Sequence, residues 1–316
     1  MEKLLEIKNL NLFFGENQAL YDVSLSLEKG KVHALAGESG CGKTMTAMSV
    51  MRLIPKSAQI KSGEIIFNGE NILYYSEKQM RELRGNKIAL IPQEPMTSLN
   101  PLYTIGNQLI ESIRVHSKVS RNQALRKAKE VLDMVRMPDI STKLNSYPHE
   151  LSGGMKQRII IAMALASKAE LIIADEPTTA LDVTIQKQIM DLLDEIKTNF
   201  GTTVLLISHD LALVSNYADK VSVMYSGHVV EEAESDEFFK NPMHPYSRAL
   251  LNSLPTKNPM LKLKTIEGVP PSIQEKISGC KFNPRCSLCV PNICQKEQPE
   301  LKEMTSNHFV SCLIKK

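Results

Sequence analysis

The sequence predicts an α/β fold in which buried strands of a parallel sheet alternate with helices. Three short, mainly apolar segments support this prediction: residues 32–36, 171–174 and 203–208. Runs of this kind are typical of strands that are covered on both faces. Each run leads into a polar or glycine-rich loop, and α/β proteins bind their ligands at the carboxyl ends of such strands.

The segments between these strands predict the other elements. Residues 4–27 alternate apolar and polar side chains, as expected for strands solvated on one face. Residues 44–54 carry several methionines at helical spacing and end before a proline, so a core-packed helix is expected there. An Asn-Gly turn divides residues 62–72 into a strand pair, and residues 105–145 are expected to be mostly helical.

Composition bounds the class of protein. The 316 residues suffice for one large domain and a smaller one. The chain holds 38 Lys+Arg and 35 Asp+Glu, and a net charge of +3 argues neither for nor against a nucleic-acid partner. No nucleic-acid partner is expected. The longest apolar run, residues 159–166, is far shorter than the roughly 20 residues needed to span a bilayer. With no signal-peptide pattern at residues 1–14, we expect a cytosolic polypeptide that reaches a membrane only by docking on a partner.

The strand at 32–36 runs into a loop that matches G-x-x-x-x-G-K-[ST]. Its glycines allow the backbone N–H groups to turn inward and form a nest for phosphate oxygens, and a helix beginning near Lys43 adds its positive dipole end. Lys43 is placed to reach the β- and γ-phosphates, and the Thr44 hydroxyl to ligate Mg²⁺. The residues expected to bind the nucleotide phosphates here are Gly37, Ser39, Gly40, Cys41, Gly42, Lys43 and Thr44.

A second predicted anion site opens another helix. Ser152 is a favourable N-cap, and Gly153 and Gly154 expose backbone N–H groups at the start of the following apolar helix. Two such sites in one chain indicate that two separate phosphate contacts are needed.

Polar side chains follow the other buried strands. Asp175 and Glu176 end an apolar run, where the first can hold Mg²⁺ through water and the second can polarise a nucleophilic water. Gln93 ends the strand within 87–101 and can ligate Mg²⁺ or orient water. His209 follows residues 203–208, at the expected ligand-binding edge. The signals from Gln93 and His209 alone are weak, and a lone histidine is more often structural. A lone acidic pair is usually loop solvation, but an apolar strand leading into Asp-Glu downstream of a phosphate loop is much more specific.

Two phenylalanines precede the phosphate loop. Phe13 and Phe14 are either part of the sheet core or a stacking platform for an adenine ring. Phe14 has the more suggestive spacing for stacking.

In their order, these motifs make residues 4–235 resemble the nucleotide-binding subunits of ABC transporters. The phosphate loop is similar to Walker A, Gln93 to the Q-loop, LSGGM to the signature motif and LIIADE to Walker B. The segment Ala180-Leu181-Asp182 resembles the D-loop, and His209 the switch histidine. Met155 stands where LSGGQ is commoner, but the serine and both glycines are intact.

The resemblance implies a P-loop ABC ATPase domain over residues 1–235, with a RecA-like core, an antiparallel β subdomain and a helical subdomain at about 95–160. It implies a head-to-tail dimer in which ATP lies between Walker A of one chain and LSGG of the other. Glu176 would then be the general base, His209 would steady the γ-phosphate and Asp182 would lie at the shared interface. The implied Mg²⁺ ligands are Thr44, Gln93 and Asp175, and the implied trans contacts are Ser152, Gly153 and Gly154.

Residues 236–316 are expected to form a small cysteine-rich domain. NPMHPYSRALL, residues 241–251, resembles the tail of ATPase subunits from dipeptide, oligopeptide and nickel importers. By spacing alone, the cysteines could hold zinc or an iron–sulfur cluster, or could be unliganded thiols. The subfamily resemblance implies a [4Fe–4S] cluster held by Cys280, Cys286, Cys294 and Cys312, with Cys289 outside the pattern.

The function implied by the resemblance is ATP hydrolysis that drives uptake of dipeptides or oligopeptides from the cytoplasmic face of the membrane. The implied partners are a second, related but non-identical ATPase chain, two transmembrane permease subunits and an extracytoplasmic substrate-binding protein. Import of nickel or oligosaccharides is the alternative within the subfamily. A soluble ABC ATPase is the alternative outside it, but the chain lacks the tandem domains or long insertion of that class.

Overall fold

The fold of the chain is described by a computed structural model that covers residues 2–179, 181–254 and 265–314. These residues form two compact units, residues 1–73 with 206–316 and residues 74–205. Ala180 of the predicted D-loop segment lies outside the described residues. In the part of the chain that is described, no helix is both long and apolar enough to cross a membrane.

The first unit begins with an antiparallel sheet in the order β2-β1-β4-β5. Its strands are β1 (Lys3–Phe14), β2 (Asn17–Glu28), β4 (Ala58–Phe67) and β5 (Glu70–Asn71). The predicted Asn-Gly turn joins the last two, with positive φ values of 51° at Asn68 and 84° at Gly69. The predicted antiparallel β subdomain is therefore present.

A second sheet of the first unit carries the phosphate loop. Strand β3 (Val32–Ala36) pairs in parallel with β9 (Lys220–Tyr225), which pairs antiparallel with β10 (His228–Glu234). All five residues of β3 are buried, as the apolar run predicts. Helices α1 (Lys43–Val50) and α9 (Leu211–Tyr217) also belong to this unit.

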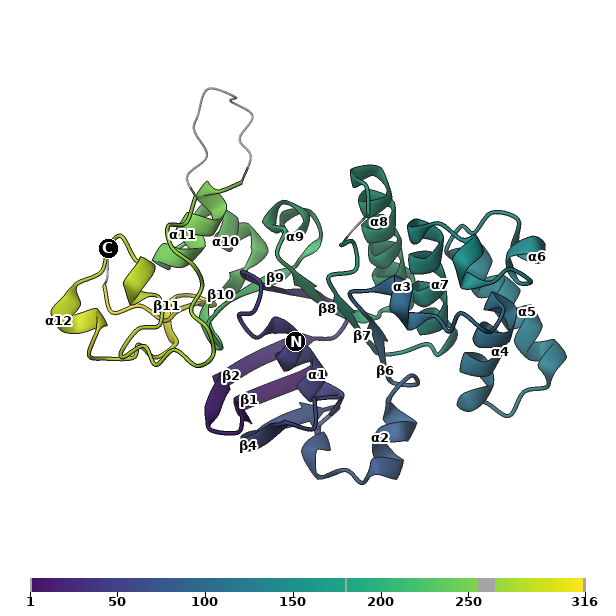
Figure 1. Cartoon of the computed structure of the whole chain (residues 1–316), viewed down its shortest axis with the longest axis horizontal. Coiled ribbons are helices and arrows are strands. Elements are labelled where there is room, and N and C mark those ends of the chain that lie inside the picture. The colour runs from purple at the N-terminus through teal and green to yellow at the C-terminus, as the bar shows by residue number, and fades with distance from the viewer. Residues whose placement is uncertain (1, 180, 255–264, 315–316) are drawn as a thin grey trace. The chain divides into compact units, whose positions relative to one another are not determined.

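The C-terminal residues extend this sheet. Strand β12 (His308–Val310) pairs with β10, and β11 (Lys302–Thr305) pairs with β12. Around them lie α10 (Ser235–Lys240), α11 (Pro245–Asn252), η3 (Asn283–Arg285) and α12 (Pro291–Cys294), coloured green to yellow in Figure 1. The described residues after 235, namely 236–254 and 265–314, thus lie in the same compact unit as the N-terminal strands. Their independence as a domain stays a prediction.

Helices predominate in the second unit. Strands β6 (Ile88–Ile91) and β7 (Leu171–Asp175) are parallel, and β8 (Thr203–Ser208) begins in this unit and ends in the first. The helices before the signature motif are η1 (Ile72–Tyr74, which starts in the first unit), α2 (Glu77–Leu83), α3 (Pro95–Ser98), α4 (Ile105–Val115), α5 (Arg121–Met134), α6 (Ile140–Lys143) and η2 (Pro148–Glu150). The long helices α7 (Gly153–Ala166) and α8 (Val183–Phe200) complete the unit.

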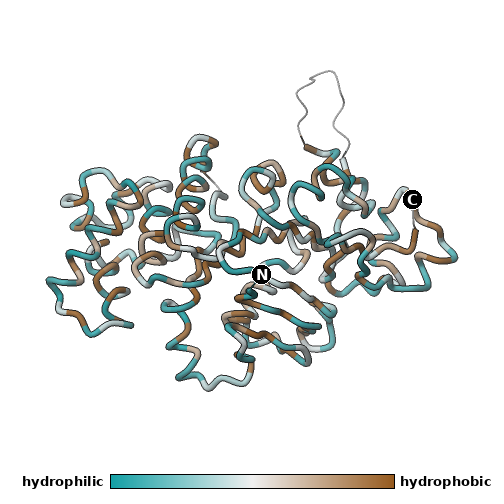
Figure 2. The backbone as a smooth tube through the Cα atoms, turned by 180° about the vertical axis from the view of Figure 1, so that it is seen from behind, coloured by the Kyte–Doolittle hydropathy of each residue, from teal (hydrophilic) through white to brown (hydrophobic). Residues whose placement is uncertain are grey.

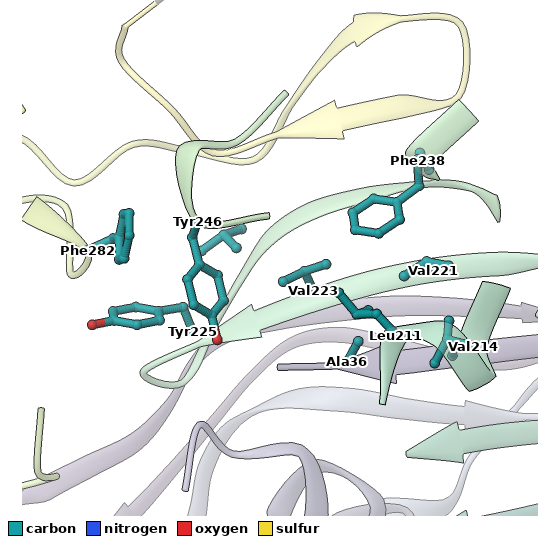
Figure 3. Close-up of a cluster of buried hydrophobic side chains, with 12 residues drawn as sticks. Ala36, Leu211, Val214, Val221, Val223, Tyr225, Phe238, Tyr246 and Phe282 are labelled. Carbon is teal, nitrogen blue, oxygen red and sulfur yellow. The ribbon is translucent and has the colours of Figure 1, made fainter. Parts of the chain in front are cut away.

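Hydropathy follows these elements. In Figure 2 hydrophobic residues are frequent along the sheet strands, whereas teal and brown alternate along the helices, as expected for helices with one buried face. In the first unit, one buried cluster joins β3, α9, β9 and β10 to the C-terminal residues. Figure 3 shows Tyr225, Tyr246 and Phe282 at one end of this cluster. The described residues after 235, called the C-terminal segment below, are therefore packed into the core of the first unit through Phe238, Tyr246 and Phe282.

Candidate functional site

The predicted phosphate loop connects β3 to α1. All three of its glycines have positive φ, which is strained for other residues, and at two of them a Cβ atom would also clash. Gly37 has φ 147°, and a Cβ atom there would lie 2.3 Å from the Met224 carbonyl oxygen. Gly42 is the N-cap of α1 with φ 109°, and a Cβ atom there would lie 2.8 Å from a methyl carbon of Leu20. The loop is thus pressed against the strands beneath it, where only glycine fits.

Lys43 is held within the same loop. Its side chain is buried, and its Nζ donates hydrogen bonds to the carbonyl oxygens of Gly37 (2.8 Å) and Glu38 (2.9 Å). Burial raises the pKa of the neighbouring Cys41 thiol, so this cysteine remains a neutral packing group under the loop at physiological pH. The two hydrogen bonds to Gly37 and Glu38 thus hold Lys43 Nζ against the backbone of the loop.

In the second unit, the structure brings the predicted catalytic residues Gln93 and Glu176 together. Asp175 is the last residue of β7 and is buried, and Glu176 follows it. Glu176 Oε2 accepts hydrogen bonds from Gln93 Nε2 (2.8 Å) and Thr179 Oγ1 (3.0 Å). Sequence reasoning missed Thr179, although its place three residues after Glu176 is a signal for such a contact.

Backbone strain marks the same residue. Glu176 has φ 46°, in the left-handed region that non-glycine residues rarely occupy. Residues held there cost about 1–3 kcal/mol and concentrate at functional sites. Two hydrogen bonds, from Gln93 and Thr179, hold the Glu176 carboxylate beside this strained backbone.

The signature segment lies in the same unit. Ser152 is the N-cap of α7, and its Oγ accepts a hydrogen bond from the Met155 N–H (3.3 Å), as predicted for this helix start. Asp182 caps α8 in the same way by accepting from the Ile185 N–H (3.0 Å). A Cβ atom on Gly154 would lie 2.9 Å from Ile185 Cγ2, so a glycine lets the two helices approach closely.

His209 and Phe14 lie in the first unit. His209 follows β8 and is exposed, and Asp210 caps α9 by accepting from two backbone N–H groups. Phe14 ends β1 and is partly buried. Lys61 Nζ lies 4.0 Å from the ring centre of Phe13, so a cation–π contact occupies one face of that ring. This contact favours Phe14 over Phe13 as the stacking residue.

The C-terminal cysteines gather around one small cavity. It is lined by Cys280, Cys286, Cys294 and Cys312, together with His244, Asn283 and apolar residues. Cys289 is not among the lining residues, which agrees with its place outside the sequence pattern. The donor set suits a group bound by four thiolates. However, no three Cys, His, Asp or Glu side chains of the described residues are already close enough together to hold a metal ion.

Two of the thiols that line this cavity, those of Cys280 and Cys286, are harder to deprotonate than a free cysteine. Burial, together with the neighbouring cysteines, raises the pKa of Cys280 and of Cys286 to about 11. Both are therefore protonated at neutral pH, and a bound cation would have to displace their protons.

Comparison with known proteins identifies both parts of the chain. Residues 20–179 match the family described as ABC transporter. Residues 230–294 match the family described as oligopeptide/dipeptide transporter, C-terminal region.

Several curated proteins resemble the chain over nearly its whole length. A probable peptide ABC transporter ATP-binding protein of Sinorhizobium fredii is 48% identical, over 98% of this chain and 94% of its own. The oligopeptide transport ATP-binding protein OppD of Bacillus subtilis is 43% identical, over 98% and 88%. The dipeptide transport ATP-binding protein DppD of Lactococcus lactis is 43% identical, over 98% and 90%.

Solved structures resemble the fold as well. A dimeric ATP-binding cassette in a post-hydrolysis state with ADP and Pi superposes with a TM-score of 0.66 and 26% identity, covering 73% of this chain and 99% of that one. CbiO1 of Clostridium perfringens, part of an ABC transporter complex, gives a TM-score of 0.67 at 26% identity, covering 76% and 92%.

Proposed function

Because this chain belongs to the ATP-binding subunits of ABC transporters and carries the C-terminal region of oligopeptide and dipeptide transporters, we propose that it hydrolyses ATP to drive the import of short peptides. Its relatives are named as peptide, oligopeptide and dipeptide transport ATP-binding proteins, which favours peptides over nickel or oligosaccharides as cargo. A soluble, non-transport ATPase is disfavoured, since the transporter C-terminal region is present.

The contact between Gln93 and Glu176 carries the catalytic part of this proposal. It joins the predicted Q-loop to the carboxylate that follows Walker B, at the end of a buried strand. A carboxylate fixed in this way can accept a proton from an attacking water as general base. Phosphoryl transfer depends mainly on positioning and charge stabilisation, so a fixed carboxylate beside Asp175 suits it.

The roles of the other site residues are assigned from their positions in the motifs. Lys43 and the N–H groups of its loop would bind the ATP phosphates, and Phe14 would stack on the adenine. His209 would contact the γ-phosphate. Mg²⁺ would be held by the Thr44 hydroxyl, the Gln93 amide and the Asp175 carboxylate, oxygen donors that this ion prefers.

The second half of each ATP site would come from another chain. Ser152, Gly153 and Gly154 are at a helix start, where free N–H groups favour anions, and Asp182 caps the neighbouring helix. We propose a head-to-tail dimer with a related, non-identical ATPase, docked on two permease subunits at the cytoplasmic membrane face. A separate substrate-binding protein would deliver the peptide. Co-purification of these partners, followed by identification of what the binding protein captures, tests the cargo.

For the cysteine cavity we propose a [4Fe–4S] cluster, with zinc as the alternative. The four cysteines of the subfamily pattern line the same cavity, and its other walls are largely apolar. Such a group would stabilise the fold of the loop-rich C-terminal residues by binding several of their side chains at once. Anaerobic purification with iron and sulfide analysis tests this proposal: about four of each per chain supports the cluster, and colourless protein with stoichiometric zinc contradicts it.

The catalytic proposal is tested by Glu176→Gln. The amide keeps an oxygen to accept from Gln93 but removes the negative charge, so kcat should fall by about 100- to 10,000-fold while ATP binding is retained. Glu195→Gln is the matched control, because Glu195 is an exposed partner of Arg136 in the same unit. ATP turnover and nucleotide affinity are measured for both. Near-normal turnover by Glu176→Gln would exclude Glu176 as the base.

A further inference from the structure

Glu38, the second residue of the phosphate loop, is held from three sides. Its carbonyl oxygen accepts from Lys43 Nζ, at 2.9 Å. Its backbone N–H donates to Tyr246 Oη, at 2.9 Å. Its carboxylate forms a two-bond ion pair with the Arg285 guanidinium, at 2.7 and 3.0 Å. Glu38 therefore connects the loop lysine to two residues of the C-terminal segment, Tyr246 through its backbone and Arg285 through its side chain.

The ion pair is well shielded and geometrically specific. The Arg285 side chain is 5% exposed and that of Glu38 24%. Two parallel hydrogen bonds between a guanidinium and a carboxylate fix both direction and distance, which a lysine cannot do. The remaining donors of Arg285 are also used, since Nε donates to the Glu267 carbonyl (3.0 Å) and a terminal nitrogen to the Gly268 carbonyl (3.3 Å). The guanidinium is thus locked in one orientation.

A cluster of aromatic rings holds Arg285 and Tyr246 in place. Phe282 is buried and packs edge-on against Tyr225 of β9, with ring centres 5.1 Å apart. It also contacts Tyr246 with the rings tilted by 56° and their centres 5.2 Å apart. Figure 3 shows these three rings side by side. Tyr225 Oη also lies 3.4 Å from the Arg285 guanidinium. Because Phe282 and Arg285 belong to the same short turn, packing of the ring sets the position of the guanidinium.

We propose that Arg285 and Tyr246 are positioning residues for the phosphate loop, so that the C-terminal segment contributes to ATP affinity. The inference rests on the proposed role of this loop in binding ATP phosphates. Tyr246 binds the N–H of the peptide whose carbonyl is that of Gly37, and Arg285 binds the Glu38 side chain. Together they restrain the Gly37 and Glu38 carbonyl oxygens, both of which accept hydrogen bonds from Lys43 Nζ. Preorganised binding groups lose less conformational freedom when the ligand binds, and loosening them therefore weakens affinity.

The segment also carries the cysteine cavity. Phe282 lines that cavity, and Cys286, another lining residue, directly follows Arg285. Metal content must therefore be measured in every variant, so that an effect on the loop is separated from loss of a group bound by the cysteines.

The test compares ATP affinity with thermal stability in the purified full-length chain. Arg285→Met removes the ion pair with the Glu38 carboxylate, and Tyr246→Phe removes the hydrogen bond from the Glu38 N–H. Both variants should raise the Kd for a fluorescent ATP analogue by about tenfold, the effect expected for losing a buried or charge-assisted hydrogen bond. In ATPase assays the loss should fall on KM more than on kcat. Arg285→Lys keeps the positive charge but cannot form the two parallel hydrogen bonds to the Glu38 carboxylate. Its affinity for the analogue should therefore lie between those of Arg285→Met and the wild type.

Arg248→Met is the matched control, because Arg248 lies in the same C-terminal segment and its Nε donates to the Pro242 carbonyl. Its Kd should equal that of the wild type. The double variant Glu38→Gln/Arg285→Met should bind no more weakly than Arg285→Met alone, since the two side chains act as one unit.

Lys43→Ala is measured in parallel to separate this inference from the proposed function. If Lys43→Ala binds ATP normally, the proposed role of the loop is wrong. If Lys43→Ala loses binding while Arg285→Met and Tyr246→Phe keep the wild-type Kd, only the positioning inference is overturned. Tyr246→Phe removes a single oxygen atom, so it decides the question even if Arg285→Met does not fold.

Discussion

Two of the buried histidines of the first unit, His33 and His244, make this unit sensitive to acid. His33 on β3 is 2% exposed, and its ring nitrogens lie 2.8 Å from Ser222 Oγ and 3.3 Å from the Ser26 carbonyl oxygen. His244 is 1% exposed and caps α11, where its Nδ1 accepts from the Tyr246 N–H at 3.0 Å. Burial lowers the pKa of each histidine to about 4. Both are therefore neutral in the folded protein down to well below pH 6.

The sign of the effect follows from proton linkage. In the unfolded chain both histidines have a pKa of about 6.5, so below that pH the unfolded state binds protons that the folded state does not. Stability is thus unaffected above about pH 6.5 and is lost as the pH falls from there toward 4. At pH 5 each histidine costs about 2 kcal/mol, or about 4 kcal/mol for the two, against a typical total stability of about 5–15 kcal/mol.

Urea unfolding followed by circular dichroism between pH 7.5 and 5, at constant ionic strength, measures this loss. His244→Asn should reduce it by about 2 kcal/mol at pH 5, because asparagine also caps helices and does not titrate. The control His149→Gln removes an exposed histidine of the second unit and should leave the pH dependence unchanged. A free energy of unfolding that is flat from pH 7 to 5 would refute the reasoning.

Three further outcomes are expected. Gly37→Ala should abolish ATP binding, measured by titration with a fluorescent analogue, because the new methyl group would lie 2.3 Å from the Met224 carbonyl oxygen; unchanged affinity would contradict the loop geometry. Phe282→Ala should lower the free energy of unfolding by about 3–5 kcal/mol, since it empties a buried aromatic site; a loss below about 1 kcal/mol would show that the C-terminal segment is not packed as described. Cys294→Ser should reduce bound iron or zinc, measured by elemental analysis, whereas Cys289→Ser should not; equal losses would contradict the four-cysteine assignment.

Much of the fold could be predicted from the sequence. The apolar run 32–36 is strand β3, the helix expected near Lys43 begins at that residue, and Ser152 caps the predicted helix α7. These features depend on short-range chemistry: burial of a continuous apolar run, glycine at positive φ and a serine hydroxyl three residues before its N–H partner. The motifs of the site were found for the same reason, since each is contiguous in the chain.

Other features could not be predicted, because they depend on side chains that meet only in the folded chain. The Gln93 amide was expected to serve Mg²⁺ or water, and the structure shows that it also donates to Glu176, 83 residues away. The six cysteines could be counted, but spacing alone did not show that four of them surround one cavity and that Cys289 does not.

By itself, the sequence determined that this chain binds a nucleotide, because ordered local motifs specify backbone nests and catalytic side chains. The resemblance of those motifs and of the C-terminal residues to peptide importer ATPases implied hydrolysis and transport. Only the tertiary structure decided what holds the phosphate loop. Glu38 occupies a position where the motif accepts any residue, and Arg285 lies 247 residues away. No local rule pairs them: packing of Phe282 on Tyr225 and Tyr246 brings the guanidinium to the loop.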